Sequence, residues 1–310
     1  MSVPGRPRLV ILRALGLGDF LTAVPALRAL AAAFPGHERL LVAPRWLEPL
    51  AGLIGGAVDA LLDAEGRTAV PAVLPVPAHG ADVAVNLHGR GPQSHAALRA
   101  TRPGRLIAFA ADGVQGPAWR AGEHEVARWC RLLDESGIPA DPGALDLDAP
   151  PGAWSHGATV LHPGAAAPAR RWPLERWAAV ARAERAAGRD VLLSAGPGEE
   201  EAAAAVAADA ALGPGAVRTG GDVADLTRLV AGAGRVACAD TGVAHLATAL
   251  RVPSVVLFGP TSPAEWGPPP ERGRHRVLWT GRRGDPNGVV PDPGLLEIQP
   301  AAVAAELAAT

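Results

Sequence analysis

Short apolar runs alternate along the chain with segments whose apolar residues recur at helical spacing. The short runs have the length of buried strands, and the other segments have the pattern of helices that cover a sheet. Alternating strands and helices are typical of parallel sheets, which predicts an α/β fold. Predicted strands occupy residues 9–13, 40–43, 60–62, 81–87, 106–109, 159–162, 190–194, 236–239 and 254–258, and predicted helices occupy residues 20–34, 46–53, 123–136, 174–187, 222–231 and 301–309.

A segment rich in proline, glycine and aspartate, residues 141–154, interrupts this alternation. The chain has 310 residues, which is enough for two α/β domains of ordinary size. We therefore expect a Rossmann-like domain at residues 1–150 and a second one at residues 151–299. Residues 269–293, rich in proline, glycine and arginine, are expected to form long loops.

Composition narrows the class of protein. Hydrophobic residues make up 48% of the chain, which supports a substantial core, and the formal net charge is only -2, which argues against nucleic acid as a partner. Cys130 and Cys238 lie in apolar surroundings and are expected to be core residues. The apolar run near the N-terminus is interrupted by Arg13, which predicts a core strand and not a signal peptide. Without an uncharged apolar run of ~20 residues, we expect a soluble cytoplasmic protein, with peripheral membrane contact left open.

Residues 236–268 form the stretch around which the rest of the chain is organised. A predicted strand ends at Asp240, Thr241 and Gly242, and the helix that follows has His245 in its first turn. In parallel sheets, the loop after a strand faces the ligand crevice, and a helix N-terminus attracts phosphate. The alternative is an ordinary capped helix start, and the local pattern leaves both interpretations open.

A glycine-bearing loop follows the first predicted strand and leads to Asp19. Gly16 and Gly18 suggest a dinucleotide-binding turn, but the third glycine is absent and an acidic residue would repel a pyrophosphate. In the functional interpretation Asp19 is a carboxylate held at the mouth of a crevice, and in the structural one it is a helix N-cap. Pro25, inside the helix predicted at residues 20–34, indicates a kink or a later helix start.

The loop after the strand at residues 81–87 is dense in hydrogen-bonding side chains. His88, Arg90 and His95 follow the end of that strand, where open α/β sheets bind ligands. They could contact an acceptor or a phosphate, and each could equally be a solvated loop residue.

Other polar clusters carry weaker signals. Arg170 and Arg171 lie just ahead of a predicted helix, which suits an anion site as well as a solvent-facing pair. Asp146 and Asp148 form an Asp-x-Asp pattern in the predicted linker, too weak to indicate a metal. The glutamates at 199–201 suit the first turn of a helix and need no further role.

Four motifs in order give a more specific signal. Together they resemble glycosyltransferase family 9, the bacterial ADP-heptose:lipopolysaccharide heptosyltransferases, from about residue 10 to about residue 268. They are Gly16-Leu17-Gly18-Asp19 through Pro25-Ala26-Leu27, His162-Pro163-Gly164-Ala165 through Arg171-Trp172-Pro173, Asp240-Thr241-Gly242 with His245-Leu246-Ala247, and Leu257-Phe258-Gly259-Pro260-Thr261 with Trp266.

The resemblance implies a GT-B architecture with an acceptor-side domain at residues 1–150 and a donor domain at residues 151–299. It also implies that the helix at residues 300–310 packs back on the first domain. The implied activity is an inverting transfer of a sugar, with heptose favoured, from an ADP-sugar to a hydroxyl of a glycan or glycolipid of the cell envelope. The implied reaction needs no metal or other cofactor, and it would take place in the cytoplasm or at the inner face of the membrane. The oligomeric state stays open.

The resemblance also assigns residues. Asp19 matches the general base that takes the proton of the acceptor hydroxyl. Arg170 lies where the family commonly has a lysine that contacts the donor diphosphate, and all 29 basic residues of this chain are arginine. Candidates on the acceptor side are Gly18, His88 and Arg90. The residues that match the donor-site loop are Asp240, Thr241, Gly242 and His245.

The chain departs from the family pattern at Ala165, Ala166 and Gly198, where hydroxyl or acidic residues are common. Two other functions compete with the transferase: a catalytically silent nucleotide-sugar-binding protein and, with less support, an NAD-dependent oxidoreductase. Asp19 discriminates between them, because a protein that only binds a nucleotide sugar has no use for a base at that position.

Overall fold

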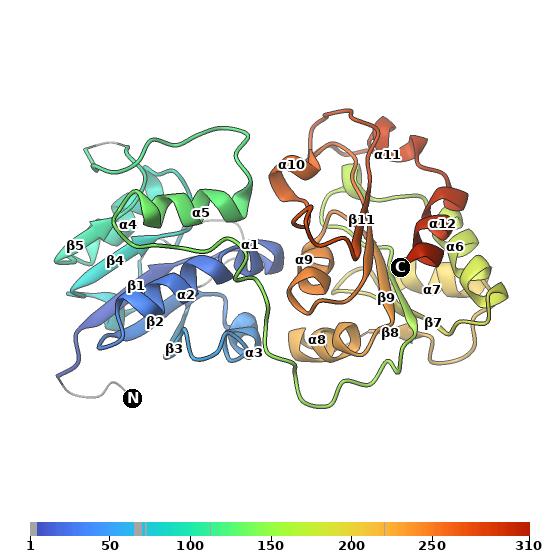
Figure 1. Cartoon of the computed structure of the whole chain (residues 1–310), viewed down its shortest axis with the longest axis horizontal. Coiled ribbons are helices and arrows are strands. Elements are labelled where there is room, and N and C mark those ends of the chain that lie inside the picture. The colour runs from blue at the N-terminus through green and yellow to red at the C-terminus, as the bar shows by residue number, and fades with distance from the viewer. Residues whose placement is uncertain (1–4, 65–69, 72, 112, 220) are drawn as a thin grey trace. The chain divides into compact units, whose positions relative to one another are not determined.

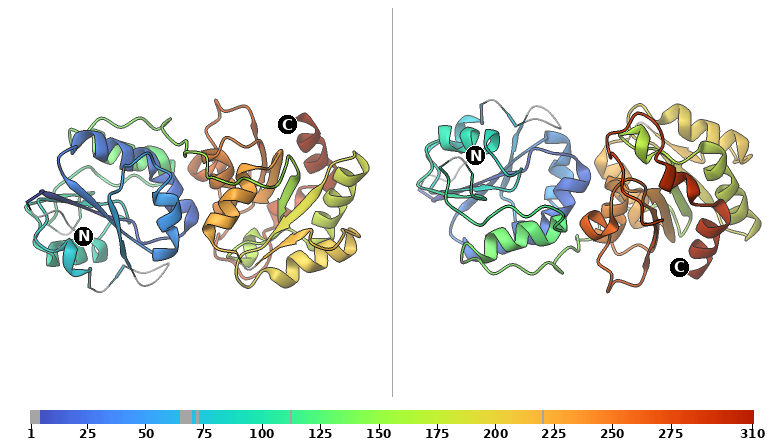
Figure 2. Two further views of the ribbon diagram at one scale, coloured as in Figure 1. Left: turned by 90° about the horizontal axis from the view of Figure 1, so that it is seen from below. Right: turned by 90° about the horizontal axis from the view of Figure 1, so that it is seen from above.

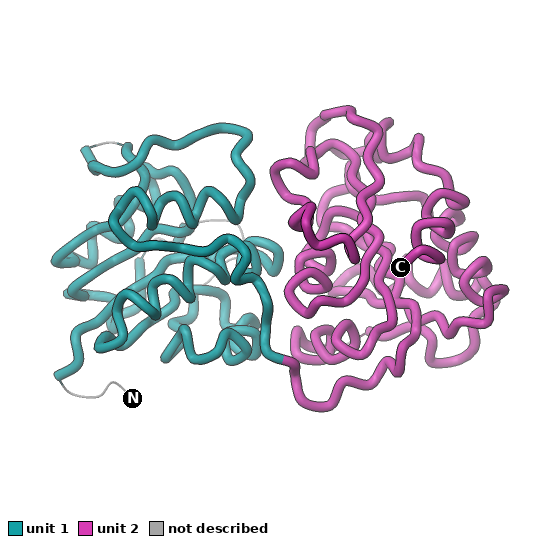
Figure 3. The backbone as a smooth tube through the Cα atoms, in the orientation of Figure 1, with its two compact units in different colours: residues 1–148 teal, residues 149–310 magenta. Residues whose placement is uncertain are grey.

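The computed structural model describes residues 5–64, 70–71, 73–111, 113–219 and 221–310 (Figure 1). The chain forms two compact units, residues 1–148 and residues 149–310 (Figure 3). This division falls within the proline- and glycine-rich segment expected as a linker, next to the expected boundary at residue 150. Each unit contains one parallel sheet with helices on both faces (Figure 2).

Unit 1 holds a five-stranded parallel sheet in the order β3-β2-β1-β4-β5. The central strands are buried because helices cover both faces, and Val10 and Leu12 of β1 join a core cluster with Leu98 of α4. The strands are β1 (Arg8–Leu12), β2 (Glu38–Ala43), β3 (Ala60–Asp63), β4 (Val83–Asn86) and β5 (Arg105–Ile107). The helices are α1 (Leu17–Thr22), α2 (Val24–Ala33), α3 (Glu48–Ala51), α4 (Gln93–Ala100) and α5 (Glu125–Asp134), with 3₁₀ turns at Arg45–Leu47 and Val76–Ala78.

Unit 2 holds a six-stranded parallel sheet in the order β11-β10-β9-β6-β7-β8. Helices α8 and α9 lie on one face, and α6, α7 and α12 lie on the other (Figure 1). The strands are β6 (Thr159–His162), β7 (Val191–Ser194), β8 (Val217–Arg218), β9 (Arg235–Ala239), β10 (Ser254–Leu257) and β11 (His275–Leu278). The helices are α6 (Leu174–Ala186), α7 (Glu200–Asp209), α8 (Val223–Ala231), α9 (Gly242–Ala249), α10 (Pro263–Trp266), α11 (Pro293–Glu297) and α12 (Pro300–Ala309), with a 3₁₀ turn at Pro168–Arg170.

Several elements differ from the expectation. The helix predicted at residues 20–34 is two helices, since α1 begins at Leu17 and α2 restarts at Val24, with Pro25 in its first turn. Strand β11 lies among residues expected to be loops; it is a half-exposed edge strand, so its sequence lacks the continuous apolar run of a buried one.

The C-terminal helix also differs, since α12 packs on α6 and β10 of unit 2 and not on the first domain. Val303 and Leu307 are buried in the core of unit 2, and Arg235 donates a hydrogen bond to the Leu307 carbonyl at 2.6 Å. An Ala-rich helix carries few large apolar side chains, so its sequence does not specify the surface that it covers.

The strand orders create one topological switch point in each sheet. In unit 1 the chain moves outward in opposite directions from β1 and β4, and in unit 2 from β6 and β9. Loops diverge at the carboxyl ends of such strand pairs and leave a crevice there, which is where open α/β sheets bind ligands. Within the described part of the chain, every helix is too short or too polar to cross a lipid bilayer.

Candidate functional site

The switch point of unit 1 brings together two loops that the sequence singled out. Leu12 pairs with Asn86 at the carboxyl ends of β1 and β4, so the loop that leads to Asp19 and the loop that carries His88 and Arg90 leave the sheet side by side. The structure therefore places the predicted base and the predicted acceptor-side residues at the same edge of one sheet.

Asp19 lies in the first turn of α1, whose N-cap is Gly16, so the N-cap interpretation of Asp19 is wrong. Its side chain is 32% exposed and reaches solvent at this edge. Burial raises the pKa of the Asp19 carboxyl above its ordinary value; Arg13 opposes that shift and Glu125 adds to it. A partly accessible carboxylate with a raised pKa has the properties of a general base.

A buried arginine that the sequence analysis did not assign fixes the position of Asp19. The guanidinium of Arg13 is fully buried and donates from Nε to the backbone carbonyl of Asp19 at 2.8 Å and from Nη1 to that of Leu87 at 2.5 Å. Its Nη2 donates to Thr22 Oγ1 and to Glu125 Oε1, both at 3.1 Å. Arg13 thus ties α1 to the ends of β1 and β4 and to α5.

His88 and its neighbours occupy contrasting environments. The backbone N–H of His88 donates to Asn86 Oδ1 at 3.0 Å, while its Nδ1 is buried and has no hydrogen-bond partner among the described residues. Burial and, secondarily, the charge of Arg13 lower the pKa of His88 to about 4, so its ring is neutral at pH 7. Arg90 is exposed, whereas His95 is a buried residue of α4 and not a solvated loop residue.

The switch point of unit 2 brings the predicted donor residues together. His162 at the end of β6 pairs with Cys238 of β9, so the turn that follows His162 lies beside the Asp240 loop. Arg170 Nη1 donates to the Asp240 carbonyl at 3.1 Å, which links the two loops directly. The Nε of Arg170 is buried and lacks a partner among the described residues, so the guanidinium keeps capacity for a further acceptor.

Asp240 is buried at this edge. Its own burial raises the pKa of the carboxyl to about 6, while Arg170 and a hydrogen bond with Thr261 pull it down. The Asp-Thr-Gly stretch continues into α9: Thr241 is the N-cap, and Gly242 is the first helical residue. His245 follows in the next turn, with its ring edge-on to Trp266 of α10 at a centroid distance of 6.0 Å. A guanidinium and a helix N-terminus at one sheet edge form an anion-binding arrangement.

Glu199 is a second residue that the sequence analysis missed. Its carboxylate accepts a hydrogen bond from the Gly196 N–H at 2.8 Å and lies 3.6 Å from Nε2 of His162, so it joins the loops after β6 and β7. A Cβ on Gly164 would fall 2.1 Å from the Glu199 carboxyl carbon, which explains the glycine there. The Gly196-Pro197-Gly198 turn ahead of a glutamate is the available signal, but glutamates at a helix start have an ordinary explanation in the helix dipole.

Other singled-out residues have structural roles or lie apart from these loops. Arg171 is exposed and donates to the Ala165 carbonyl at 2.9 Å. Burial raises the pKa of both Cys130 and Cys238 to about 12, as expected for core thiols. The Asp146 carbonyl accepts a hydrogen bond from Arg28, and the described residues contain no cluster of three or more potential metal ligands.

Comparisons with known proteins agree with the motifs. The sequence model of Glycosyltransferase family 9 (heptosyltransferase) matches residues 117–285, more than half of the chain. The chain belongs to glycosyltransferase family 9. Over 163 residues it is 33% identical to lipopolysaccharide heptosyltransferase 1 of Pseudomonas aeruginosa, an alignment that covers 48% of this chain and 43% of that relative.

Solved structures of this family share the fold along the whole chain. The ADP-heptose lipopolysaccharide heptosyltransferase II of E. coli superposes with a TM-score of 0.74 at 21% identity, covering 97% of this chain and 98% of that one. A family 9 glycosyltransferase of Veillonella parvula gives a TM-score of 0.78 at 20% identity, covering 98% and 96%. The expected GT-B fold is thereby confirmed.

Proposed function

We propose that this chain transfers a sugar, with heptose favoured, from an ADP-sugar to a hydroxyl group of a glycan or glycolipid of the bacterial cell envelope. The observation that carries the proposal is the gathering of the motif residues at the two switch points, with Asp19 at one and Arg170 and Asp240 at the other. The named activity of its relatives, transfer from ADP-heptose in lipopolysaccharide synthesis, supports the choice of sugar and nucleotide.

The proposed donor site is the carboxyl edge of the unit 2 sheet. Arg170 would bind the diphosphate through its free guanidinium face, and the N-terminus of α9 with Thr241 and Gly242 would add N–H groups and a favourable dipole. These groups would stabilise the negative charge that develops on ADP as it leaves, so the proposed reaction requires no metal. His245 would border the donor beside Trp266.

The proposed chemistry is a single displacement. The acceptor hydroxyl oxygen forms a bond to the anomeric carbon while the bond from that carbon to the diphosphate oxygen breaks, and ADP leaves with the electron pair. Attack opposite the leaving group inverts the anomeric configuration. The hydroxyl proton passes to the Asp19 carboxylate, and His88 and Arg90, which share its switch point, would orient the acceptor near Gly18.

Paired variants test this assignment. Asp19→Asn should lower kcat by about 10²- to 10⁴-fold and leave the affinity for ADP unchanged, because it removes only the base. Arg170→Ala should weaken ADP binding by about ten- to a hundredfold, because a charged hydrogen bond to phosphate is lost. Calorimetry with ADP, UDP and GDP, with and without EDTA, measures affinity, and coupled ADP release measures turnover.

Surface variants provide the control. Arg182 and Asp209 form an exposed ion pair in unit 2, so Arg182→Ala and Asp209→Asn should change neither ADP affinity nor turnover. Unchanged ADP affinity in Arg170→Ala would refute its phosphate role. Tight ADP binding without turnover on any glycan or glycolipid acceptor would favour a nucleotide-sugar-binding protein instead.

A further inference from the structure

Two carboxyl groups in unit 1, the buried Glu125 and the partly exposed Asp19, share one buried arginine. Arg13 Nη2 lies 3.1 Å from Glu125 Oε1 and 3.5 Å from Asp19 Oδ1. The first separation is a normal hydrogen bond, and the second is an ion pair beyond normal hydrogen-bond length. Arg13 is therefore hydrogen-bonded to Glu125. It interacts with the Asp19 carboxylate through its charge, without a direct hydrogen bond.

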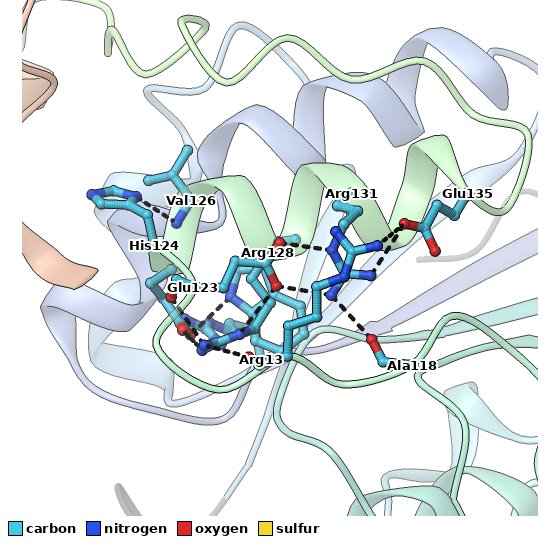
Figure 4. A network of polar contacts seen from close by, with 11 residues as sticks. Arg13, Ala118, Glu123, His124, Val126, Arg128, Arg131 and Glu135 are labelled. Carbon is cyan, nitrogen blue, oxygen red and sulfur yellow. Dashed lines mark hydrogen bonds and ion pairs between the residues drawn. The ribbon is translucent and has the colours of Figure 1, made fainter. Parts of the chain in front are cut away.

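Glu125 is held for this task by three donors. Besides Arg13, it accepts a hydrogen bond from the Trp129 indole N–H at 2.9 Å and another from Arg128 Nη1. The ring of Trp129 also lies under the Arg13 guanidinium at 4.8 Å, so the same residue supports both partners. Figure 4 shows this part of the network, with Arg13 beside Arg128 at the start of α5. Such a fully bonded buried carboxylate is held in one position.

We propose that Glu125 is a positioning residue for the base: by binding Arg13, it keeps that guanidinium from pairing tightly with the Asp19 carboxylate. A carboxylate that is hydrogen-bonded to arginine is a weak base, since the pair stabilises its charged form. With Nη2 occupied by Glu125 and Thr22, Arg13 does not hydrogen-bond to the Asp19 carboxylate, which can then accept the proton of an acceptor hydroxyl. This inference rests on the proposed function of Asp19.

The other charged groups nearby do not replace Glu125 in this role. His88 follows β4 and is neutral at pH 7, so it does not balance the charge of Arg13. Arg128 adds positive charge on α5, and its Nη1 is bonded to Glu125 itself. Glu123 lies just ahead of the N-cap of α5 and pairs with Arg131 at 2.7 Å. Glu125 is thus the carboxylate that is hydrogen-bonded to Arg13, at the same Nη2 that lies near Asp19.

The test measures the titration of Asp19 directly. Side-chain ¹³C carboxyl resonances are followed against pH by NMR, and the Asp19 resonance is identified by its loss in Asp19→Asn. In Glu125→Gln the midpoint of Asp19 should fall by on the order of one pH unit, because a like charge is lost and Arg13 turns fully toward Asp19. The acid limb of kcat/KM should move to lower pH by the same amount, with a several-fold lower kcat and an unchanged affinity for ADP.

Control variants separate this role from a merely structural one. Glu123→Gln removes an acid from the same segment without touching Arg13, so the Asp19 midpoint should stay at its original pH. Thr22→Val removes the other acceptor of Nη2 at constant charge and should lower the midpoint in the same direction by a smaller amount. It serves as the test if Glu125→Gln does not fold.

If the titration midpoint of Asp19 is unshifted in folded Glu125→Gln, the proposal is overturned. If only Thr22→Val folds, an unshifted midpoint in that variant overturns it. Because NMR reads the midpoint without substrate, absence of turnover in the unmodified chain counts against the proposed function alone. An unshifted midpoint in an active variant counts against the role of Glu125 alone.

Discussion

Burial raises the pKa of the Asp240 carboxyl from its ordinary value of 3.8 to about 6. The loop places it beside Arg170 and Thr261, yet burial outweighs both. Carboxyl groups with strongly shifted pKa values are frequent at functional sites, because binding or catalysis can require a group whose burial lowers the stability of the fold. We therefore expect Asp240 to lower the stability of the fold while it serves the proposed donor site.

This conflict predicts a stabilising substitution. The pKa of Asp240 is higher in the folded state than in the unfolded state. The folded state therefore binds more protons between about pH 4 and pH 6, and the free energy of unfolding falls as pH rises through that window. Burial of the charged Asp240 carboxylate therefore lowers the free energy of unfolding at pH 7 by at most about 3 kcal/mol. Asp240→Asn should consequently be about 1–3 kcal/mol more stable than the unmodified chain at pH 7, with the difference vanishing near pH 4, and should bind ADP less well.

Denaturant unfolding at several pH values measures this difference. Asp209→Asn serves as the matched control, because that aspartate is about half exposed and its surface ion pair contributes little to stability. An Asp240→Asn protein that is less stable at pH 7 would show that Arg170 and Thr261 stabilise the charged carboxylate by more than its burial costs.

At the scale of elements, α12 belongs to the core of unit 2, and this determines what its removal would affect. Leu307 is fully buried in the cluster that includes Trp177 and Val255. Leu307→Ala should cost about 2–5 kcal/mol, as expected for a large-to-small core substitution. Hydrogen exchange resolved by peptide should show reduced protection in α6 and β10 of unit 2, on which α12 packs, with unit 1 unaffected.

Glu306→Ala provides the comparison on the same helix. Glu306 is partly exposed and faces Arg276 at 3.7 Å, so its loss should change stability by less than about 1 kcal/mol. If Leu307→Ala instead reduced protection in unit 1, the helix would pack on that unit, as the family resemblance had suggested.

The elements also show what the sequence could reveal. Strands such as β1, β6 and β9 are predictable because full burial requires continuous apolar runs. Asp19, Arg170 and Asp240 can be singled out because each follows such a strand or lies in a recognisable motif. Arg13 and Glu125 were not found because they are 112 residues apart, and only the packing of α5 near β1 brings them together. Glu199 was not singled out because a glutamate at a helix start is explained by its favourable interaction with the helix dipole.

At the scale of the whole molecule, the two candidate sites are built independently. Unit 1 carries Asp19 and the residues that position it, and unit 2 carries every residue assigned to the donor. Each unit also has its own buried core around its own sheet. The proposed donor site therefore depends on hydrogen bonds made within residues 149–310, such as the link from Arg170 to Asp240.

This independence predicts that residues 149–310, expressed alone, fold and bind ADP within about tenfold of the affinity of the full chain, since each 1.4 kcal/mol of lost interaction costs a factor of ten. Circular dichroism and a cooperative thermal transition establish folding, and calorimetry measures affinity. Arg170→Ala should weaken binding in the fragment by the same factor as in the full chain. A folded fragment without affinity for ADP would mean that unit 1 contributes directly to the donor site, and Asp19, His88 and Arg90 would then be the first residues to test for that contribution.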